Sequence, residues 1–304
     1  MTAGDPSLFV GVDVGASKIA VGLVELPGGR VVASASEPTP SIDSVADHVD
    51  LVVGASTRMF ERAGARSVAG LGVGVCELVD RDGRVRSAAS VELRGDRLIA
   101  SLSSLSANAV IDSDVRAHAL AEASVGLGRS FEDFAFVSAG TGISSCLVIG
   151  GRPYAGARGN AIVLASSPVT VRCTSCGAET SEILEEVASG RAIATAWGHG
   201  RAEDVFDAAV TGDDRASTII ARAATALGGA LAFLANVTDP GAIVIGGGLA
   251  SARGHFWIDV ERETRMRIWS EETRALPFAL STLGPDAGVV GAACLPWVGG
   301  VAAI

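Results

Sequence analysis

The chain has 304 residues, enough for two ordinary domains that each enclose a substantial core. Hydrophobic residues make up 48% of it, 38 residues are glycine, and the formal net charge is −10. Since the sequence shows no basic stripe and no interleaving of basic and aromatic residues, we expect neither a nucleic acid nor an anionic membrane surface as partner. An anionic substrate would need a local device such as backbone amides, a metal ion or a lysine.

The cysteines and the apolar stretches indicate the compartment. The 5 cysteines are odd in number and lie mostly in apolar runs, which favours a reducing compartment over a set of disulfides. The N-terminal segment lacks the charged and uninterrupted apolar regions of a signal peptide. Residues 223–237 form the most apolar stretch, which is short and split by glycines, so we expect no membrane span. The sequence predicts a soluble, cytoplasmic protein.

The first half of the chain alternates strand and helix patterns. Residues 8–35 predict three strands in a meander, because valines recur near period two between glycine-bearing turns. A helix is expected over residues 41–63, with Val45 on its apolar face. A strand over 68–75, a short helix over 97–105 and a strand over 108–112 follow, and Asp114 begins the next helix.

The pattern restarts at Phe134 and predicts an internal duplication. "FAFVSAGTGISSCLVIGGR" has the layout of "FVGVDVGASKIAVGLVELPGGR": an apolar strand, a glycine turn, a second strand and a further turn. Helices over 182–197 and 216–235, a strand over 242–245 and a helix capped by Asp286 are expected beyond it. We predict an α/β protein with two related domains facing a cleft, formed by residues 1–115 with 287–304 and by residues 116–286.

Glycine-bearing turns recur at strand ends, and one of them carries the only lysine of the chain. The turns are residues 15–17, just before Lys18, residues 140–142, and the triglycine 246–248. Neither the P-loop nor the Rossmann fingerprint occurs at any of them. Glycine at a strand end lets backbone amides approach a ligand closely. The alternative is that these are three tight turns of a glycine-rich protein.

Taken together, the turns resemble a known set of motifs. D-x-G-x-[ST]-K at 13–18, G-T-G at 140–142 and D-P-x-x-I-V-I-G-G-G at 239–248 resemble the phosphate and adenosine motifs of actin-like sugar kinases, more narrowly of the ROK family. "ASGRAI" and "DAGVVGAA" also match in order and spacing. The resemblance implies duplicated actin-like ATPase (ribonuclease H-like) domains with a nucleotide cleft between them, and a homodimer.

The resemblance also implies roles for the residues of these turns. Asp13 would orient hydrated Mg²⁺ against the β- and γ-phosphates of ATP. The phosphates would lie on the backbone of both hairpin turns, and adenosine against the triglycine; these residues are Gly15, Ala16, Ser17, Lys18, Gly140, Thr141, Gly142, Gly246, Gly247 and Gly248. Lys18 would supply local positive charge in an acidic protein, the alternative being a solvated charge on a hairpin.

A carboxylate at a helix start is the candidate catalytic base. In the family an Asn-Asp pair begins the helix after a strand, and Asp114 matches that Asp while Ser113 stands at the Asn position. A later family Asn is Arg116 here. The alternatives are that Asp114 only favours the helix start through the helix dipole, or that Asp112 is the base. His118, one turn further, is expected to be a partly buried filler.

The acceptor and zinc motifs depart from the family pattern. Val163 and Ser166 stand where the family has a Glu and a His that bind sugar hydroxyls, and Ser90 takes the place of a sugar-binding Asn. Glu185 matches a second acceptor-contacting Glu, and Cys76-Glu77 replaces a Pro-Gly pair. Of the zinc motif only Cys173 and Cys176 remain, which is too few ligands for structural zinc, so we expect no zinc.

These departures lead to three functional hypotheses. The first is an ATP-dependent kinase for a sugar or sugar-like polyol other than glucose, possibly a C7-cyclitol. The second is an ordinary hexose or N-acylhexosamine kinase, and the third is a non-catalytic ligand sensor. The family's repressors carry a DNA-binding segment before the kinase-like core, whereas only 12 residues precede Asp13 here, so we do not expect DNA binding. Lys18 and Asp114 are retained, so we expect an active enzyme rather than a non-catalytic sensor. ATP and polyphosphate stay open as donors.

Overall fold

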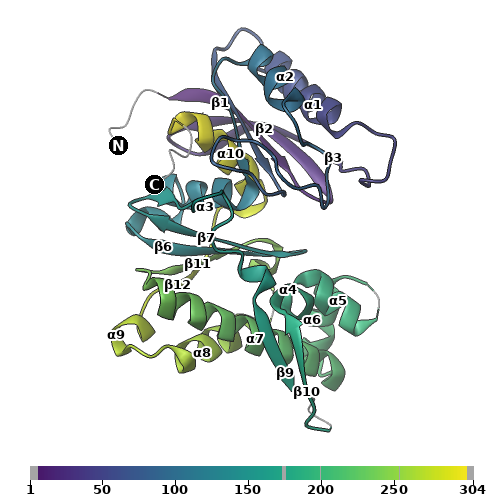
Figure 1. Ribbon diagram of the computed structural model, residues 1–304, viewed down its shortest axis with the longest axis vertical. Helices are drawn as coiled ribbons and strands as arrows, with labels where there is room; N and C mark the ends of the chain where they lie inside the picture. Colours follow the sequence, from purple (N-terminus) through teal and green to yellow (C-terminus); the bar gives the residue numbers. More distant parts are fainter. Residues whose placement is uncertain (1–5, 173–175, 199, 253, 300–304) are drawn as a thin grey trace. The chain divides into compact units, whose positions relative to one another are not determined.

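The protein is described by a computed structural model that covers residues 6–172, 176–198, 200–252 and 254–299. It divides by packing into unit 1, formed by Met1–Glu132, Val148–Ala161 and Thr282–Ile304, and unit 2, formed by Asp133–Leu147 and Ile162–Ser281 (Figure 1). Residues 116–132 thus pack with unit 1, although the sequence placed the division after residue 115. The functional two-domain division and its nucleotide cleft stay predictions.

Unit 1 is built on a five-stranded sheet in the order β3-β2-β1-β4-β5. Its strands are β1 (Ser7–Val14), β2 (Lys18–Leu26), β3 (Arg30–Pro38), β4 (Val68–Val75) and β5 (Ala109–Ser113). The first three form the expected antiparallel meander, whereas β4 runs parallel to both β1 and β5. The carboxyl ends of β1, β4 and β5 therefore meet at one edge of the sheet.

Helices cover both faces of this sheet (Figure 1). They are α1 (His48–Ala63), α2 (Arg97–Leu105), α3 (Asp114–Ser124) and α10 (Ala287–Trp297). The alternation along β1 explains the two layers: Val10 and Val12 join the apolar cluster under α1 and α2, whereas Phe9 joins the cluster of α3 and α10.

Two expected helix starts need correction. The helix expected from residue 41 begins at His48, because the Asp47 side chain caps it by accepting from the backbone N–H groups of Val49 and Asp50. Val45, expected on the buried face, is fully exposed. Asp286 does lie at the N-cap position of α10, but its side chain makes no capping hydrogen bond among the described residues.

Glycines in the sheet let α10 lie directly on it. A Cβ on Gly11 in β1 would lie 2.0 Å from the carbonyl oxygen of Val289, and one on Gly72 in β4 would lie 1.7 Å from that of Ala292. Real Cβ atoms never come so close, so only glycine admits this packing. The close approach fixes where the first residues of α10 lie with respect to the end of β1.

Unit 2 repeats the topology of unit 1. The second sheet has the order β12-β11-β6-β7-β8, which reproduces β5-β4-β1-β2-β3 strand for strand. Its strands are β6 (Phe134–Ala139), β7 (Ile143–Ile149), β8 (Arg152–Pro153), β11 (Ile243–Gly246) and β12 (Phe278–Leu280). β7 leaves unit 2 at Leu147, and β8 packs with unit 1. The order confirms the duplication that the sequence predicted.

The helices of unit 2 gather around one long buried helix. They are α4 (Leu184–Ala188), α5 (Gly190–Trp197), α6 (Ala202–Val210), α7 (Asp214–Thr238), α8 (Phe256–Arg267) and α9 (Glu271–Arg274). A two-stranded sheet of β9 (Pro168–Arg172) and β10 (Glu179–Ile183) adjoins α4 in sequence, and short 3₁₀ turns lie at Leu127–Ser130, Leu164–Ser166, Gly248–Ser251 and Gly284–Asp286. By length and composition α7 is apolar enough to cross a membrane, but over half of its apolar window is buried in this unit, as in core helices of soluble proteins.

One expected helix is interrupted. The helix expected over 182–197 is β10 up to Ile183, followed by α4 and α5 with a break at Ser189. Ser189 has extended backbone geometry, and its side chain accepts from the Ala192 N–H at 3.1 Å, so it ends one helix and caps the next.

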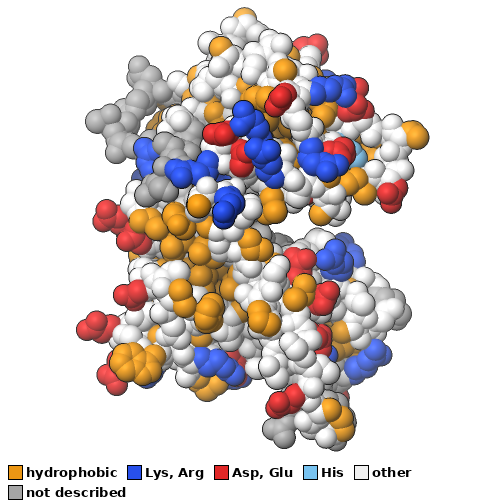
Figure 2. All heavy atoms as spheres, in the orientation of Figure 1, with side chains coloured by type: hydrophobic (Ala, Val, Ile, Leu, Met, Phe, Trp, Pro, Cys, Tyr) orange, Lys and Arg blue, Asp and Glu red, His pale blue; other side chains and the backbone are white. Residues whose placement is uncertain are grey.

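Charged side chains of both signs share the surface of unit 1. On the face drawn in Figure 2, blue and red side chains lie next to one another at several places. The exposed ion pairs of unit 1 include Arg84–Asp82 and Arg94–Glu92. Exposed pairs of this kind add little stability.

Candidate active site

The first part of the site lies at the carboxyl edge of the sheet in unit 1. Asp13 is the penultimate residue of β1, and Asp114 is the first residue of α3, directly after β5. β4 runs between them, and a Cβ on Gly74 would lie 3.4 Å from the Cα of Asp114. In sheets with parallel strands, ligands bind outside the carboxyl ends. The structure therefore brings both predicted carboxylates to the edge where chemistry is expected.

Asp13 lies against the start of α10. A Cβ on Gly288 would lie 2.1 Å from the Asp13 Oδ2 and 2.8 Å from the His118 Nε2, so both side chains converge on this glycine. A carboxylate in this position suits hydrated Mg²⁺, which prefers oxygen ligands and keeps several waters. In the sequence, Gly288 is marked only by its place in the small-residue segment "DAGVVGAA", which does not predict its contact with Asp13.

Asp114 has the environment of a general base. Burial raises its pKa to about 6, and the negative charge of Asp13 adds to this, while His118, the Val115 N–H and Arg116 act in the opposite direction. Its side chain accepts from the Val115 N–H at 2.6 Å. Ser113, not Asp114, occupies the N-cap position of α3. A base whose pKa lies near the operating pH is well matched to proton abstraction.

Asp112, the alternative base, is bound to a buried arginine. It is 5% exposed, and its Oδ1 accepts from the Arg116 Nε at 2.6 Å and from the Ser113 N–H at 2.7 Å. Arg116 is equally buried and also donates to the carbonyl oxygens of Gly159 at 2.6 Å and Val79 at 2.8 Å. This ion pair ties α3 to two loops of unit 1, a role for Arg116 that sequence reasoning missed.

Ser113 holds a buried hydroxyl beside Asp114. Its Oγ has no hydrogen-bond partner within the described part of the chain, and the residue is 7% exposed. Buried polar groups are nearly always paired, so an unpaired hydroxyl next to a candidate base is consistent with a ligand as its partner. Ser113 was expected to contact the acceptor.

Cys76 and Glu77 follow β4 at the same edge. The Cys76 N–H donates to the Val14 carbonyl oxygen at 3.0 Å. Burial raises the pKa of the Cys76 thiol to about 12, and the charges of Asp114, Glu77 and Asp13 add to that shift. The Cys76 thiol is thus uncharged and lies near the carboxylates of Asp114, Glu77 and Asp13. Glu77 is near the start of the loop that leads to Ser90.

The first phosphate hairpin is closed by its own hydrogen bonds. The Gly15 N–H donates to the Lys18 carbonyl oxygen at 3.0 Å, and the Thr39 hydroxyl donates to the Gly15 carbonyl oxygen at 2.7 Å. Ala16, Ser17 and Lys18 are exposed, and Lys18 forms no ion pair with the residues described here. An exposed lysine without a carboxylate partner is compatible with phosphate binding.

Unit 2 has a candidate site of its own, which is a cavity. It has a volume of about 550 Å³, a usual size for a small-molecule site, and Gly140, Thr141, Gly190, Arg191, Gly248 and Leu249 are among its lining residues. The Gly140 N–H donates within its hairpin to Gly142 at 2.9 Å, and the Gly190 N–H donates to Gly140 at 2.7 Å. Backbone from the ends of β6 and β11 and from α5 thus forms the walls, which fits a nucleotide.

Glycine is required at one position of this wall. Gly247 has φ 85°, and a Cβ there would lie 2.4 Å from the carbonyl oxygen of Ala139. The neighbouring Gly246 is buried at the end of β11, and Gly248 begins the following 3₁₀ turn. The predicted triglycine thus lets the chain turn sharply beside the cavity that Gly248 lines.

The expected acceptor residues occupy different surroundings. Val163 is 49% exposed and Ser166 is exposed, and both belong to unit 2. The Glu185 Oε2 accepts from the Ile143 N–H at 2.8 Å, and its Oε1 lies 3.2 Å from Arg191. Glu185 therefore supports the second phosphate hairpin in the structure, and its contact with an acceptor stays a prediction.

The remnant of the zinc motif lies only partly within the described chain. Cys173 is outside the described residues, and Cys176 is exposed. No group of three or more His, Cys, Asp or Glu that could hold a metal ion occurs in the ranges that the structure describes. The expected lack of zinc stays a prediction.

Comparison with known proteins identifies the family. Residues 9–297 match the model of the ROK family. The chain belongs to this family. The glucokinase of Halalkalibacterium halodurans is 27% identical over 313 aligned residues, which cover 93% of each chain. The crystal structure of a ROK family glucokinase from Streptomyces griseus in complex with glucose and AMPPNP has a TM-score of 0.80 and 26% identity, covering 96% of this chain and 100% of that one.

A further relative matches over a shorter part. The bifunctional enzyme NanE/NanK of Brucella melitensis biotype 1 is 36% identical over 196 residues, or 63% of this chain and 36% of that enzyme. The chain thus spans little more than a third of the length of the bifunctional relatives. The structural neighbours include a ROK glucokinase and a ROK hexokinase, and the actin-like ATPase fold expected from the sequence is confirmed.

Proposed function

We propose that this ROK protein is an ATP-dependent phosphotransferase that acts on a hydroxyl of a sugar or sugar-like polyol. The observation that carries the proposal is the position of Asp114, a carboxylate with a pKa raised to about 6, beside Asp13 at the carboxyl edge of a parallel sheet. The family relatives that bear the name glucokinase support the same reaction class.

In the proposed reaction, Asp114 removes the proton of the acceptor hydroxyl. The acceptor oxygen then bonds to the γ-phosphorus of ATP, the bond from that phosphorus to the β–γ bridging oxygen breaks, and ADP leaves. Mg²⁺ would offset the charge of the β- and γ-phosphates when bound near Asp13. Ser113 would pair with an acceptor hydroxyl through its buried Oγ.

ATP would bind through the backbone-lined cavity of unit 2. Thr141 and Gly142 would present amides to the phosphates, because the Gly140 N–H is already taken up inside the hairpin. Adenosine would lie against Gly248, and the exposed Lys18 of unit 1 would add positive charge for the phosphates. A small-molecule partner and a cytoplasmic location are further parts of the proposal, and the sugar-kinase relatives support both. A homodimer is also proposed, on the family resemblance alone.

The acceptor is proposed to be a polyol other than glucose, such as a C7-cyclitol. The support is chemical: Val163 and the short Ser166 replace a carboxylate and an imidazole of the family pattern, and a hydroxyl that loses its partner costs about 1–3 kcal/mol. An ordinary hexose or N-acylhexosamine kinase is the second candidate, and the name of the glucokinase relatives favours a hexose.

A coupled assay of ADP release tests the function. Purified protein is incubated with MgATP and, in turn, with hexoses, amino sugars, deoxy sugars and cyclitols, and Asp114→Asn protein serves as the control for contaminating kinases. We expect turnover with at least one polyol and a lower kcat/KM for glucose. If glucose is the best acceptor, the second candidate is favoured. If no acceptor gives ATP-dependent turnover, the non-catalytic sensor is favoured.

A further inference from the structure

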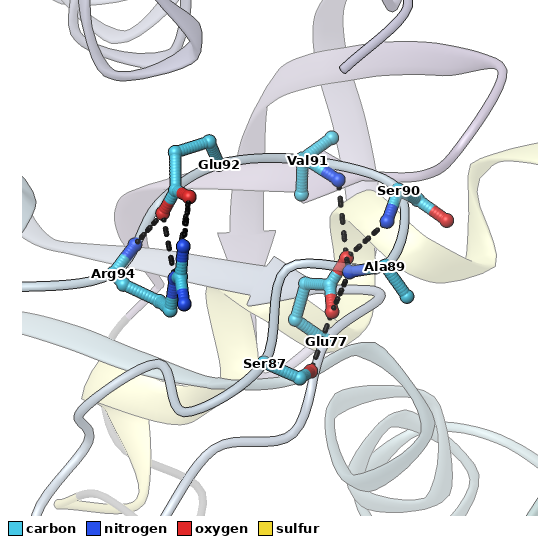
Figure 3. Close-up of polar contacts among 7 residues, drawn as sticks. All are labelled: Glu77, Ser87, Ala89, Ser90, Val91, Glu92 and Arg94. Atoms are coloured by element: carbon cyan, nitrogen blue, oxygen red, sulfur yellow. Dashed lines mark hydrogen bonds and ion pairs between the residues drawn. The ribbon is translucent and has the colours of Figure 1, made fainter. Parts of the chain in front are cut away.

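The loop that follows β4 folds back on itself, so that residues 87–91 contact Glu77 near the start of the loop. In Figure 3 the carboxylate of Glu77 lies between Ser87 and the backbone of residues 89–91, and it accepts hydrogen bonds from both sides. The donors are the hydroxyl of Ser87 and the backbone N–H groups of Ala89, Ser90 and Val91, at distances from 2.5 to 3.0 Å. Glu77 is 4% exposed, so these bonds are shielded from water.

The donors explain why a buried carboxylate is tolerated here. Burial alone would raise the pKa of Glu77, but the N–H groups of residues 89–91 and the Ser87 hydroxyl outweigh it and bring the net pKa below its usual value. The Glu77 side chain is therefore charged at neutral pH. A charged acceptor that receives several N–H bonds fixes the backbone that donates them.

The anchored loop starts at the edge where the candidate base lies. Cys76, directly before Glu77, is close enough to Asp114 and Asp13 for their charges to raise its pKa. The loop is held a second time by Arg116, which donates to the Val79 carbonyl oxygen at 2.8 Å from within α3. The start of the loop is thus tied to α3, the helix that begins with Asp114.

The part of the loop that Glu77 fixes includes Ser90, whose side chain points away from Glu77. The Ser90 N–H makes the shortest backbone bond to Glu77, 2.6 Å to Oε1. In Figure 3 the Ser90 side chain points away from the Glu77 carboxylate. The carboxylate therefore fixes the backbone of Ser90 and does not itself bind the Ser90 hydroxyl.

We propose that Glu77 is a positioning residue for the acceptor: it holds the backbone of residues 89–91 so that Ser90 meets an acceptor hydroxyl in a fixed geometry. This inference rests on the proposed function. Glu77 itself touches neither acceptor nor ATP. Its loss therefore weakens the use of the acceptor and leaves the use of ATP unchanged.

Three variants test this positioning role. Glu77→Ala removes every acceptor atom, whereas Glu77→Gln keeps an oxygen at Oε1 for the N–H groups of Ser90 and Val91 and loses only the bonds at Oε2. Glu92→Gln is the matched control, because Glu92 lies in the same loop, is exposed, and pairs with Arg94 at the surface (Figure 3).

The kinetic test separates the two substrates. KM is measured for the best acceptor at saturating MgATP and for MgATP at saturating acceptor. We expect Glu77→Ala to raise the acceptor KM about tenfold or more, Glu77→Gln to lie between it and wild type, and the KM for ATP to change less than about twofold. Equal rises in both KM values, or an unchanged acceptor KM, would overturn the inference.

Hydrogen exchange tests the anchor without any acceptor. The amides of residues 89–91 should exchange faster in Glu77→Ala than in wild type, with Glu77→Gln between the two, while those of β4 keep their rates and Glu92→Gln shows no change. Unchanged exchange at residues 89–91 would overturn the anchoring role, even in a protein with full activity. A wild type that phosphorylates no acceptor would instead overturn the proposed function, and the acceptor's part in this inference with it.

Discussion

Two carboxylates at the same edge of unit 1 have opposite surroundings. Glu77 receives hydrogen bonds from four donors of its own loop, and its pKa lies below the usual value. Asp114 receives the N–H of Val115, lies near the negative charge of Asp13, and its pKa is raised to about 6. The difference teaches that hydrogen-bond donors can outweigh the desolvation of a carboxylate, as at Glu77, whereas few donors leave its pKa raised, as at Asp114.

Replacing each carboxylate by its amide should give opposite changes in stability. A carboxylate whose pKa is lower in the folded state than in the unfolded state stabilises the fold at any pH above its unfolded-state pKa. That stabilisation is lost as the pH falls through the folded-state pKa. A raised pKa has the reverse sign: ionised Asp114 destabilises the fold once pH exceeds its unfolded pKa, about 3.9. At pH 7.5 the Tm of Glu77→Gln should therefore fall, while that of Asp114→Asn should not.

The largest kinetic effect is expected for Asp114→Asn. The amide keeps the shape but cannot take the proton of the acceptor, so kcat should fall by about 10²–10⁴. Nucleotide binding, measured by titration with MgATP, should stay within about threefold of wild type. Turnover near the wild-type rate would show that the contrast between Asp114 and Glu77 has no catalytic meaning.

Asp112→Asn should lower stability rather than alter the chemistry. It leaves the buried Arg116 charge without its partner, which costs about 3–5 kcal/mol in comparable buried pairs. Denaturant unfolding measures the loss, and kcat of the protein that remains folded should stay within about tenfold of wild type. A folded but inactive variant would move the role of base to Asp112.

Gly288→Ala tests whether α10 sets the position of Asp13. The added Cβ would lie 2.1 Å from the Asp13 Oδ2, so the carboxylate must shift, and misplacement by about 1 Å can cost about 10²-fold in rate. Gly54→Ala is the control, because its Cβ meets only the end of the Arg58 side chain. We expect kcat/KM for MgATP to fall in Gly288→Ala alone; equal values in both variants would contradict the role.

The smallest effect is expected for Ser113→Ala. Its Oγ has no partner among the described residues, so its removal should leave the Tm unchanged or slightly higher. If an acceptor hydroxyl supplies the missing partner, the acceptor KM should rise by about 5–15-fold, as for one hydrogen bond of about 1–1.5 kcal/mol. A lower Tm with an unchanged acceptor KM would show that the hydroxyl serves the fold.

Sequence motifs predicted the parts of the site that lie in short contiguous segments. Asp13, the hairpin turns and the triglycine are motifs of a few residues, and the repeated strand pattern predicted the duplicated sheets. Local pattern could not predict the interruption at Ser189, because an apolar period continues across it. It also could not place the start of α1, which depends on the capping bonds of Asp47.

The supporting residues were not predictable because their partners are distant in sequence. Glu77 binds amides 12–14 residues away, and Arg116 binds the carbonyl oxygen of Gly159, 43 residues away. Gly288 meets Asp13 from the opposite end of the chain. A single sequence shows these residues as a departure from a motif or as one small residue among many, and only tertiary packing reveals what they contact.

The pH dependence of kcat/KM for the acceptor tests the central claim most directly. Asp114 must be ionised to accept a proton, so the wild-type profile should fall tenfold per pH unit below a pKa of about 6. Glu77→Gln should keep this acid limb at the same pH, because Glu77 only positions the loop, and Asp114→Asn should lack it. A wild-type profile that stays flat down to pH 5, or an acid limb that persists in Asp114→Asn, would contradict the assignment of Asp114 as the base.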